Sequence, residues 1–232
     1  MCGKYADIYK MIEKTKAVDM HDLIDMVIAT LNARDPYTYA HSLRVAEMSE
    51  MIAKQMNLNT GITENIHLAA HLHDIGKIGV PDRVLNKAGK LNEEEWKHMQ
   101  AHSGIGYEIL DKLPLFRSIT NIVLYHHERF DGLGYPSGLK GTNIPLESRI
   151  IAVADSFDAI TSDRPYRTGM DYEFGFYEIN KHSGEQFCPE IVECFLDIRS
   201  EIPMALEKTC AYESLPVAFV GHEELRHSRR QG

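Results

Sequence analysis

The fold class is decided by residues 150–160, whose sequence is IIAVADSFDAI. The apolar residues of this segment recur at the spacing of one face of an α-helix: Ile150, Ile151, Ala154, Phe157 and Ile160. Asp155 interrupts this apolar face. Burying a carboxylate costs on the order of several kcal/mol unless a cation or hydrogen-bond donors meet it. The segment therefore predicts a helical core with a metal ion or an arginine beside Asp155.

The same helical period dominates the rest of the chain. Further amphipathic segments are predicted within residues 23–31, 41–52, 66–76, 119–126, 172–180 and 189–198. Asn92, followed by Glu95 three residues later, predicts a capping box at the start of another helix. Residues 130–145 are rich in Gly, Pro and Asn and predict a loop. After about Pro203 the pattern weakens, and residues 215–220 fit either a short strand or a helix. The sequence thus predicts an all-α protein, a single bundle of roughly seven to nine helices.

The composition limits the classes of function. The chain has 232 residues, a net charge of −9 and a pI near 5.7, which argues against binding of duplex nucleic acid. The four cysteines form no C-x-x-C pair, so a thiolate zinc site or a disulfide scaffold is not indicated. The N-terminus lacks the apolar region of a signal peptide, and no segment approaches the roughly 20 apolar residues of a membrane helix. We expect a cytoplasmic protein without membrane contact.

Histidine and aspartate carry the chemistry. A single histidine on an apolar face is usually a hydrogen-bonded core residue, but here several predicted helices each supply one or two candidates. The candidates are His41, His73, Asp74, His102, His126, His127 and Asp155. Mixed imidazole and carboxylate ligands favour Fe, Mn or Zn over Ca or Mg. The set exceeds the three protein ligands of a catalytic zinc, so two metals sharing a carboxylate fit better.

Three longer segments carry a family resemblance. They are residues 73–82 (HDIGKIGVPD), residues 126–136 (HHERFDGLGYP) and residues 149–167 (RIIAVADSFDAITSDRPYR). With His41 upstream, their order resembles the HD phosphohydrolase superfamily and, within it, the HD-GYP domains. The resemblance covers about residues 35–195. It implies a helical bundle of the HD-domain type at 35–200, with an N-terminal helical extension at 1–34 packed on it and a partly irregular extension at 201–232.

The resemblance also implies roles for residues. The seven candidates above match metal ligands, and Asp74 matches the carboxylate that bridges two divalent transition-metal ions. Iron or manganese is expected, with zinc, nickel and cobalt as alternatives. The substrate contacts are expected from Lys77 on the scissile phosphate and from Tyr135, Arg164 and Arg167, with Asp158 and Asp163 orienting the arginines. Tyr37 stands where some members have a glutamate that supports a third metal, which favours two ions unless Asp35 substitutes for it.

The activity implied by the resemblance is hydrolysis of cyclic di-GMP to linear pGpG and on to GMP. A metal-bridging hydroxide would attack in line, with Lys77 and Asp74 as the catalytic residues. The alternatives are a hydrolase of another nucleotide, such as cyclic GMP-AMP, and a cyclic-dinucleotide sensor without catalysis. The resemblance also implies that the loop at Gly134-Tyr135-Pro136 can contact diguanylate cyclase (GGDEF) domains. Formation of a homodimer is a further possibility that the sequence leaves undecided.

Overall fold

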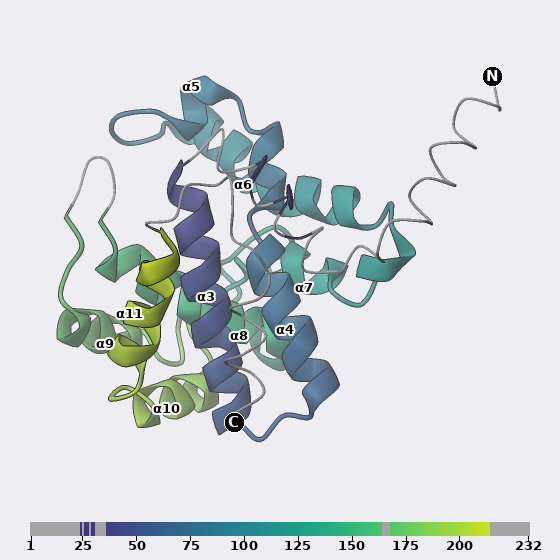
Figure 1. Cartoon of the computed structure of the whole chain (residues 1–232). Helices are drawn as coiled ribbons and strands as arrows, with labels where there is room; N and C mark the ends of the chain where they lie inside the picture. Colours follow the sequence, from purple (N-terminus) through teal and green to yellow (C-terminus); the bar gives the residue numbers. More distant parts are fainter. Residues whose placement is uncertain (1–23, 25, 28, 31–35, 164–167, 214–232) are drawn as a thin grey trace, which may run out of the picture.

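The computed structural model describes residues 24, 26–27, 29–30, 36–163 and 168–213. Within these residues the regular structure is helical, and the one bridge is an isolated pairing of Ser183 with Phe187 (Figure 1). Nine α-helices, α3 to α11, are assigned in this part of the chain. The predicted all-α class is confirmed.

The α-helices are α3 (Pro36–Gln55), α4 (Thr60–Leu72), α5 (Asp82–Leu85), α6 (Glu93–Leu110), α7 (Thr120–Leu124), α8 (Leu146–Thr161), α9 (Tyr172–Lys181), α10 (Pro189–Asp197) and α11 (Ile202–Glu213). Three 3-10 helices join them: η1 (Ile75–Gly79), η2 (Pro114–Phe116) and η3 (Gly141–Asn143). The predicted loop over residues 130–145 is confirmed, with η3 as its one helical turn among these described residues.

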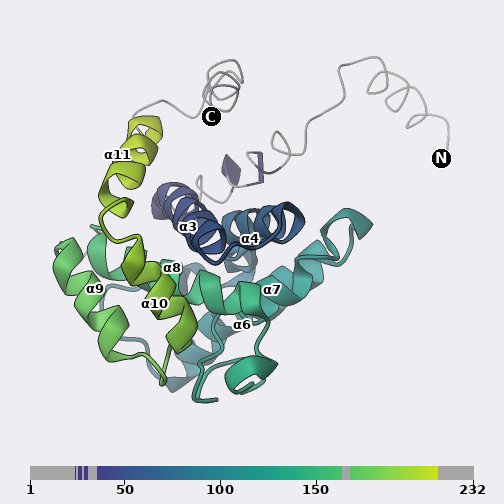
Figure 2. The same ribbon diagram turned by 90° about the horizontal axis from the view of Figure 1, so that it is seen from below.

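Helix α3 lies at the centre and packs against α4, α8, α10 and α11. Figure 2 shows α3 and α4 as a layer over α7 and α8. The segment quoted first forms most of α8, and its Phe157 ring lies 4.8 Å from the ring of Phe176 and 5.1 Å from that of Phe195. Burying each such side chain contributes about 1.5–3 kcal/mol, so these rings hold α9 and α10 against α8.

Local signals predicted some helix boundaries well and others badly. The capping box is confirmed, because the Glu95 backbone N–H donates to Asn92 Oδ1 and the Asn92 N–H to Glu95 Oε2, both at 2.8 Å. Helix α7 ends at Leu124, so the prediction that it continues to His126 was wrong. Residues 215–220 lie outside the described part of the chain.

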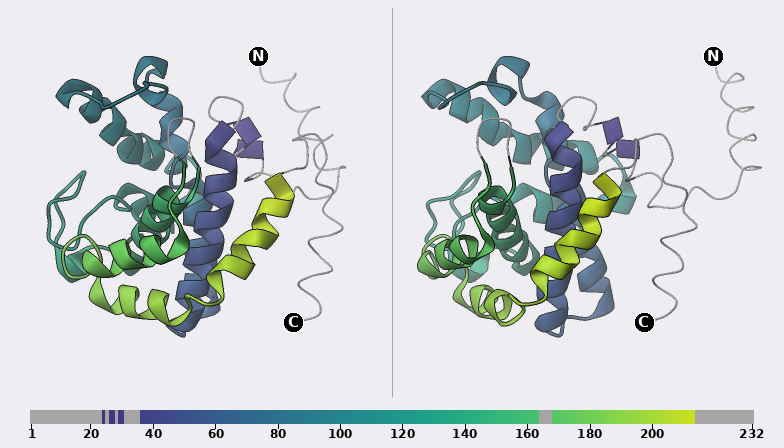
Figure 3. Two further views of the ribbon diagram at one scale, coloured as in Figure 1. Left: turned by 90° about the vertical axis from the view of Figure 1, so that its left-hand side faces the viewer. Right: turned by 60° about the vertical axis from the view of Figure 1, so that its left-hand side comes forward.

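Helix α11 extends the bundle beyond the point where the sequence pattern weakens. It packs beside α3, as Figure 3 shows, and among the side chains described for this helix Ile202 and Leu206 are buried. Near the N-terminus, Ile24 is also buried in the core. In the described part of the chain, no helix combines the length and the apolar character needed to cross a bilayer.

Candidate metal centre

The structure brings together all seven side chains that were predicted as metal ligands. His41 lies on α3, His102 on α6 and Asp155 on α8. His73 and Asp74 lie between α4 and η1, and His126 and His127 follow α7. Together they form three overlapping groups whose ligand atoms all lie within 4.8 Å of one another: His102 with His126 and His127, His41 with His73 and Asp155, and His73 with Asp74 and His126.

Neighbouring residues can face the same site here because two helices end beside it. Successive residues of an α-helix point about 100° apart, so a continuing helix could not turn both members of either pair inward. Helix α4 ends at Leu72, and Asp74 adopts φ −95° and ψ 4°, the bridge conformation that starts a turn. Helix α7 likewise ends at Leu124 before His126 and His127. The ends of these two helices therefore position four of the seven side chains.

Three of the histidines are oriented by their own local backbone. Each Nδ1 donates to the carbonyl oxygen three residues earlier: His73 to Ala70 at 2.7 Å, His102 to Met99 at 2.7 Å, and His126 to Val123 at 2.6 Å. A carbonyl oxygen only accepts hydrogen bonds, so Nδ1 carries the proton in all three rings. In the neutral ring Nε2 then presents its lone pair to the site.

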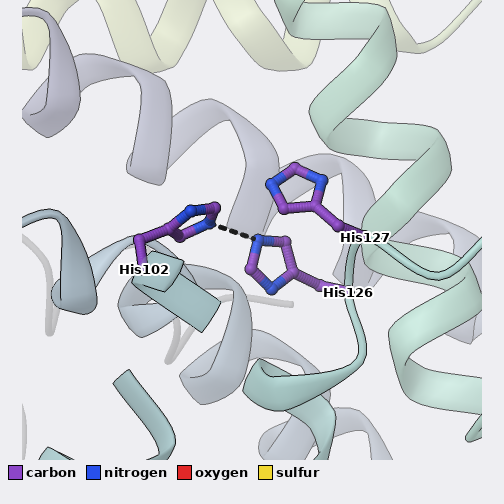
Figure 4. A group of neighbouring side chains, drawn as sticks. All are labelled: His102, His126 and His127. Atoms are coloured by element: carbon purple, nitrogen blue, oxygen red, sulfur yellow. Dashed lines mark hydrogen bonds between the residues drawn. The ribbon is translucent and has the colours of Figure 1, made fainter. Parts of the chain in front are cut away.

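Facing lone pairs make the site a good fit for a cation. His102 Nε2 lies 3.3 Å from His126 Nε2, and Figure 4 shows these rings turned toward each other beside His127. His41 Nε2 similarly lies 3.2 Å from His73 Nε2. In the His102–His126 pair both ring protons are on Nδ1 and bonded to carbonyls, so the two Nε2 lone pairs repel at this distance unless a positive charge lies near both of them. The donor set therefore suits a transition-metal ion.

Asp74 connects the two ends of the cluster. Its Oδ2 lies 3.3 Å from His73 Nε2 and 3.7 Å from His41 Nε2. Its other oxygen, Oδ1, lies 3.6 Å from His102 Nε2. One carboxylate thus presents one oxygen to each end, which is the arrangement of a bridging ligand.

The electrostatics keep most ligands in the metal-binding protonation state. Burial lowers the pKa of His102 and His126, and it lowers the pKa of His127 to about 3. Against the effect of burial, the charges of Lys77 and His73 lower the pKa of Asp74. Neutral imidazoles and ionised carboxylates are the forms that bind metals.

His41 differs, because it lies between carboxylates. Although burial lowers its pKa, hydrogen bonds to Asp155 and Asp158 raise it to about 9. The same contact with His41 lowers the pKa of Asp155, against the effect of burial. This end of the cluster therefore attracts a positive charge, which a metal ion would supply as well as a proton.

Asp158 is the main functional residue that sequence reasoning assigned to another partner. Its carboxylate is fully buried, and Oδ2 accepts a hydrogen bond from His41 Nδ1 at 2.7 Å. Arg44 donates to the same carboxylate through Nε at 2.5 Å and Nη2 at 3.2 Å. Its expected partners, Arg164 and Arg167, lie outside the described residues. The only sequence signal for this role was the position of Asp158 three residues after Asp155, nearly on the same face of α8.

Lys77 and Tyr135 lie in the cavity above the cluster. The cavity has a volume of about 370 Å³, and its polar walls include His41, Asp155 and His127. Lys77 Nζ lies 2.5 Å from Asp74 Oδ2 and is partly exposed. The Tyr135 ring lies 4.8 Å from the His127 ring at an angle of 33°. Both residues can reach a molecule bound over the cluster.

The Gly134-Tyr135-Pro136 loop is fixed directly to the ligand-bearing segment. Glu128 is buried, and its carboxylate accepts hydrogen bonds from the backbone N–H groups of Ser137 at 2.7 Å and Leu139 at 3.0 Å. A Cβ on Gly134 would lie 2.3 Å from the Arg129 backbone nitrogen, so only glycine allows this approach. Sequence reasoning had quoted Glu128 within a motif without giving it this role.

Other candidates lie away from the cavity or outside the described residues. Asp35, the possible substitute for the third-metal glutamate, lies outside the described residues. Asp163 accepts a hydrogen bond from the Gly169 N–H at 2.8 Å. Another close histidine pair, His67 and His71, has its Nε2 atoms 3.0 Å apart, His67 Nδ1 lies 2.8 Å from Glu50 Oε2, and none of these residues lines the cavity.

Residues 25–191 match the protein family described as HD domain. The chain belongs to the HD domain family. Among its relatives, the cyclic di-GMP phosphodiesterase of Thermotoga maritima is 43% identical over 201 residues, covering 83% of this chain and 55% of the relative. The 3'3'-cGAMP-specific phosphodiesterase 3 of Vibrio cholerae is 39% identical over 188 residues, covering 80% of this chain and 39% of the relative. The chain thus spans about half or less of the length of these relatives.

Solved structures agree on the fold of this HD domain. The cyclic GMP-AMP-specific phosphodiesterase V-cGAP3 of V. cholerae superposes with a TM-score of 0.63 at 20% identity, covering 84% of this chain and 54% of that one. HD-family phosphohydrolases depend on metal ions, and the His and Asp groups described above could bind them.

Proposed function

We propose that this HD domain is a metal-dependent phosphodiesterase that hydrolyses cyclic di-GMP. The observation that carries the proposal is the convergence of five histidines and two aspartates from separate helices on one cavity that also holds Lys77. The acidic chain thereby concentrates its phosphate affinity in a single place. The relative from T. maritima, named a cyclic di-GMP phosphodiesterase, supports the choice of substrate.

We propose two metal ions, one at each end of the cluster, with iron or manganese as the expected metals. His41, His73 and Asp155 would hold one ion, and His102, His126 and His127 the other, with Asp74 shared. The two oxygens of Asp74 face different ends, which supports this division. When bound, such ions supply a nucleophilic water at neutral pH and charge that favours phosphate binding.

The residues of the chain then have distinct tasks. Lys77 places its ammonium beside Asp74, where it can neutralise negative charge that develops on the phosphate. Asp74 orients both Lys77 and the ligand shell. Tyr135 forms an aromatic wall beside His127. Opening of the ring gives linear pGpG, and a second cut gives GMP. Arg164 and Arg167 stay predicted contacts for the second phosphate.

The surface of the loop also supports a protein partner. Leu133, next to the Gly134-Tyr135-Pro136 triplet, is 79% exposed, which leaves an apolar side chain of this loop accessible to a partner. This agrees with a role for the loop in contacting diguanylate cyclase (GGDEF) domains. A homodimer stays a prediction.

The second candidate substrate is 3'3'-cGAMP, favoured by the relative from V. cholerae that carries this specificity in its name. A panel of cyclic di-GMP, 3'3'-cGAMP and cyclic di-AMP, compared by kcat/KM with the metal-loaded protein, separates these readings. A higher kcat/KM for 3'3'-cGAMP would replace cyclic di-GMP as the substrate. Binding without any product would identify a sensor.

The decisive variant is Asp74→Ala. It removes the shared carboxylate, and we expect kcat/KM for cyclic di-GMP to fall about 100-fold or more, with loss of bound metal. Asp111→Ala is the matched control, because Asp111 is an exposed aspartate at the far end of α6. Hydrolysis by a folded Asp74→Ala protein at the rate of the parent would refute the assignment.

A further inference from the structure

The cavity has two chemically different halves. The metal cluster and Lys77 form a charged half. The other half is apolar and comes mainly from α5 and α6 with their connection, which supply Leu85, Leu91, Trp96 and Met99, while α8 adds Ala159. A charged phosphate gains nothing from contact with an apolar wall, whereas the flat nucleobase of the same nucleotide can pack against it. This division indicates where the base of a nucleotide substrate lies.

Trp96 is the best-placed residue for that base. It is the single tryptophan of the chain, and although it lines the cavity, it is 48% exposed. It lies on α6, which also carries His102 two turns later. An indole that stays so open to water beside a ligand-binding cavity has a large aromatic face available for stacking.

The aromatic rings form a continuous wall from the metal cluster to Trp96. The Tyr135 ring is 4.8 Å from His127 on one side and 6.4 Å from Trp96 on the other. Trp96 and Tyr135 meet at 79°, so a flat base stacked on either ring meets the other ring with its edge. His127 already covers part of Tyr135, since the two rings are tilted by only 33°. This leaves the indole as the more open stacking surface.

We propose that Trp96 stacks on one purine base of the cyclic dinucleotide and sets the affinity for it, an inference that rests on the proposed phosphodiesterase function. Every base has a π face, so stacking distinguishes bases by size and not by their hydrogen-bonding groups. Trp96 therefore selects for a purine beside the reacting phosphate and contributes equally to guanine and adenine. Choice between these two bases belongs to other residues.

The test compares Trp96→Ala, Trp96→Phe and the control Tyr177→Ala in the metal-loaded protein. Tyr177 is an exposed aromatic residue on α9, at 60%, and does not line the cavity. From the strength of base stacking, we expect Trp96→Ala to raise KM about tenfold or more, with kcat changed by less than about threefold. The rise should be similar for cyclic di-GMP, 3'3'-cGAMP and cyclic di-AMP. Trp96→Phe should keep most of the affinity, and Tyr177→Ala all of it.

Because the chain has one tryptophan, its fluorescence reports on this position alone. Titration of the parent with a phosphorothioate analogue of cyclic di-GMP that resists hydrolysis should quench the emission to saturation. An unchanged KM in Trp96→Ala, or unchanged emission at saturating analogue, would overturn the base-stacking role while leaving the phosphodiesterase intact. A parent that hydrolyses no cyclic dinucleotide would instead overturn the proposed function itself.

Discussion

The buried carboxylate of Asp158 offers the sharpest test of how the metal centre is supported. Asp158→Asn keeps the size of the side chain but removes the charge that faces His41 and Arg44. Arg44 is only 8% exposed and would keep its charge without that counter-ion. Removing one partner of a buried ion pair typically costs about 3–5 kcal/mol. For a domain of this size, such a loss lowers the melting temperature by about 6 °C or more.

The chain provides a matched control in the pair between Asp131 and Arg129. This pair has a similar geometry, with Arg129 Nη2 2.6 Å from Asp131 Oδ2, but its side chains are 31% and 22% exposed. A pair of this kind contributes about 0–1 kcal/mol, so Asp131→Asn should change stability little. The assay is equilibrium urea unfolding of chelator-treated proteins, which separates the ion pair from the metal.

A second readout tests the role of Asp158 at the metal centre. Loss of a residue that orients a ligand histidine typically lowers metal affinity by about 10–100-fold, so Asp158→Asn should retain less metal than Asp131→Asn. Adding Arg44→Met to Asp158→Asn also removes the guanidinium charge that Asp158 balances and should restore part of the stability. Equal unfolding midpoints and equal metal contents for Asp158→Asn and Asp131→Asn would refute this reasoning.

Two further predictions concern packing and pH. A Cβ on Gly76 would lie 1.8 Å from the His102 carbonyl oxygen, whereas a Cβ on Gly104 would meet nothing within 4 Å. In thermal unfolding, Gly76→Ala should therefore destabilise the protein by about 2 kcal/mol or more, and Gly104→Ala should stabilise it by about 0.5–1 kcal/mol. Equal effects of the two substitutions would contradict this packing. A hydrogen bond from His67 lowers the pKa of Glu50 from 4.5 to about 2, so its contribution to stability is complete above pH 4.5 and is lost as the pH falls toward 2. The stability difference between the parent and Glu50→Gln should therefore shrink over that range in acid unfolding, and a constant difference would exclude the contact.

The sequence was informative where the determining contacts are local. The capping box joins Asn92 and Glu95, which are three positions apart, and the apolar period of α8 repeats within its own helix. Both could be predicted without knowledge of the partners. Helix α11 shows the opposite limit, because the apolar pattern of the sequence weakens after Pro203, whereas Ile202 and Leu206 are buried and the helix packs against α3.

For the site, the sequence indicated which side chains gather but not how they are held. The helix predicted through His126 ends at Leu124, and only this early end lets both His126 and His127 face inward. The pairing of Asp158 with His41 joins residues 117 positions apart, and no local pattern encodes such a contact. The apolar half of the cavity was also missed, because the capping box predicted the helix that carries Trp96 but not the cavity that this side chain lines.

The ligand histidines differ in how far along the chain their orienting bonds reach, and His41 is the one whose bond reaches farthest among those described above. His102 and His126 are aimed by carbonyls three residues away, so their directions form together with the local turns. His41 is aimed only when α3 and α8 have docked. The orientation of His41 therefore depends on the packing of α3 against α8, whereas the ring directions of His102 and His126 depend on their own helical turns. A substitution that shifts α3 relative to α8 should therefore disturb His41 before it disturbs His102 or His126.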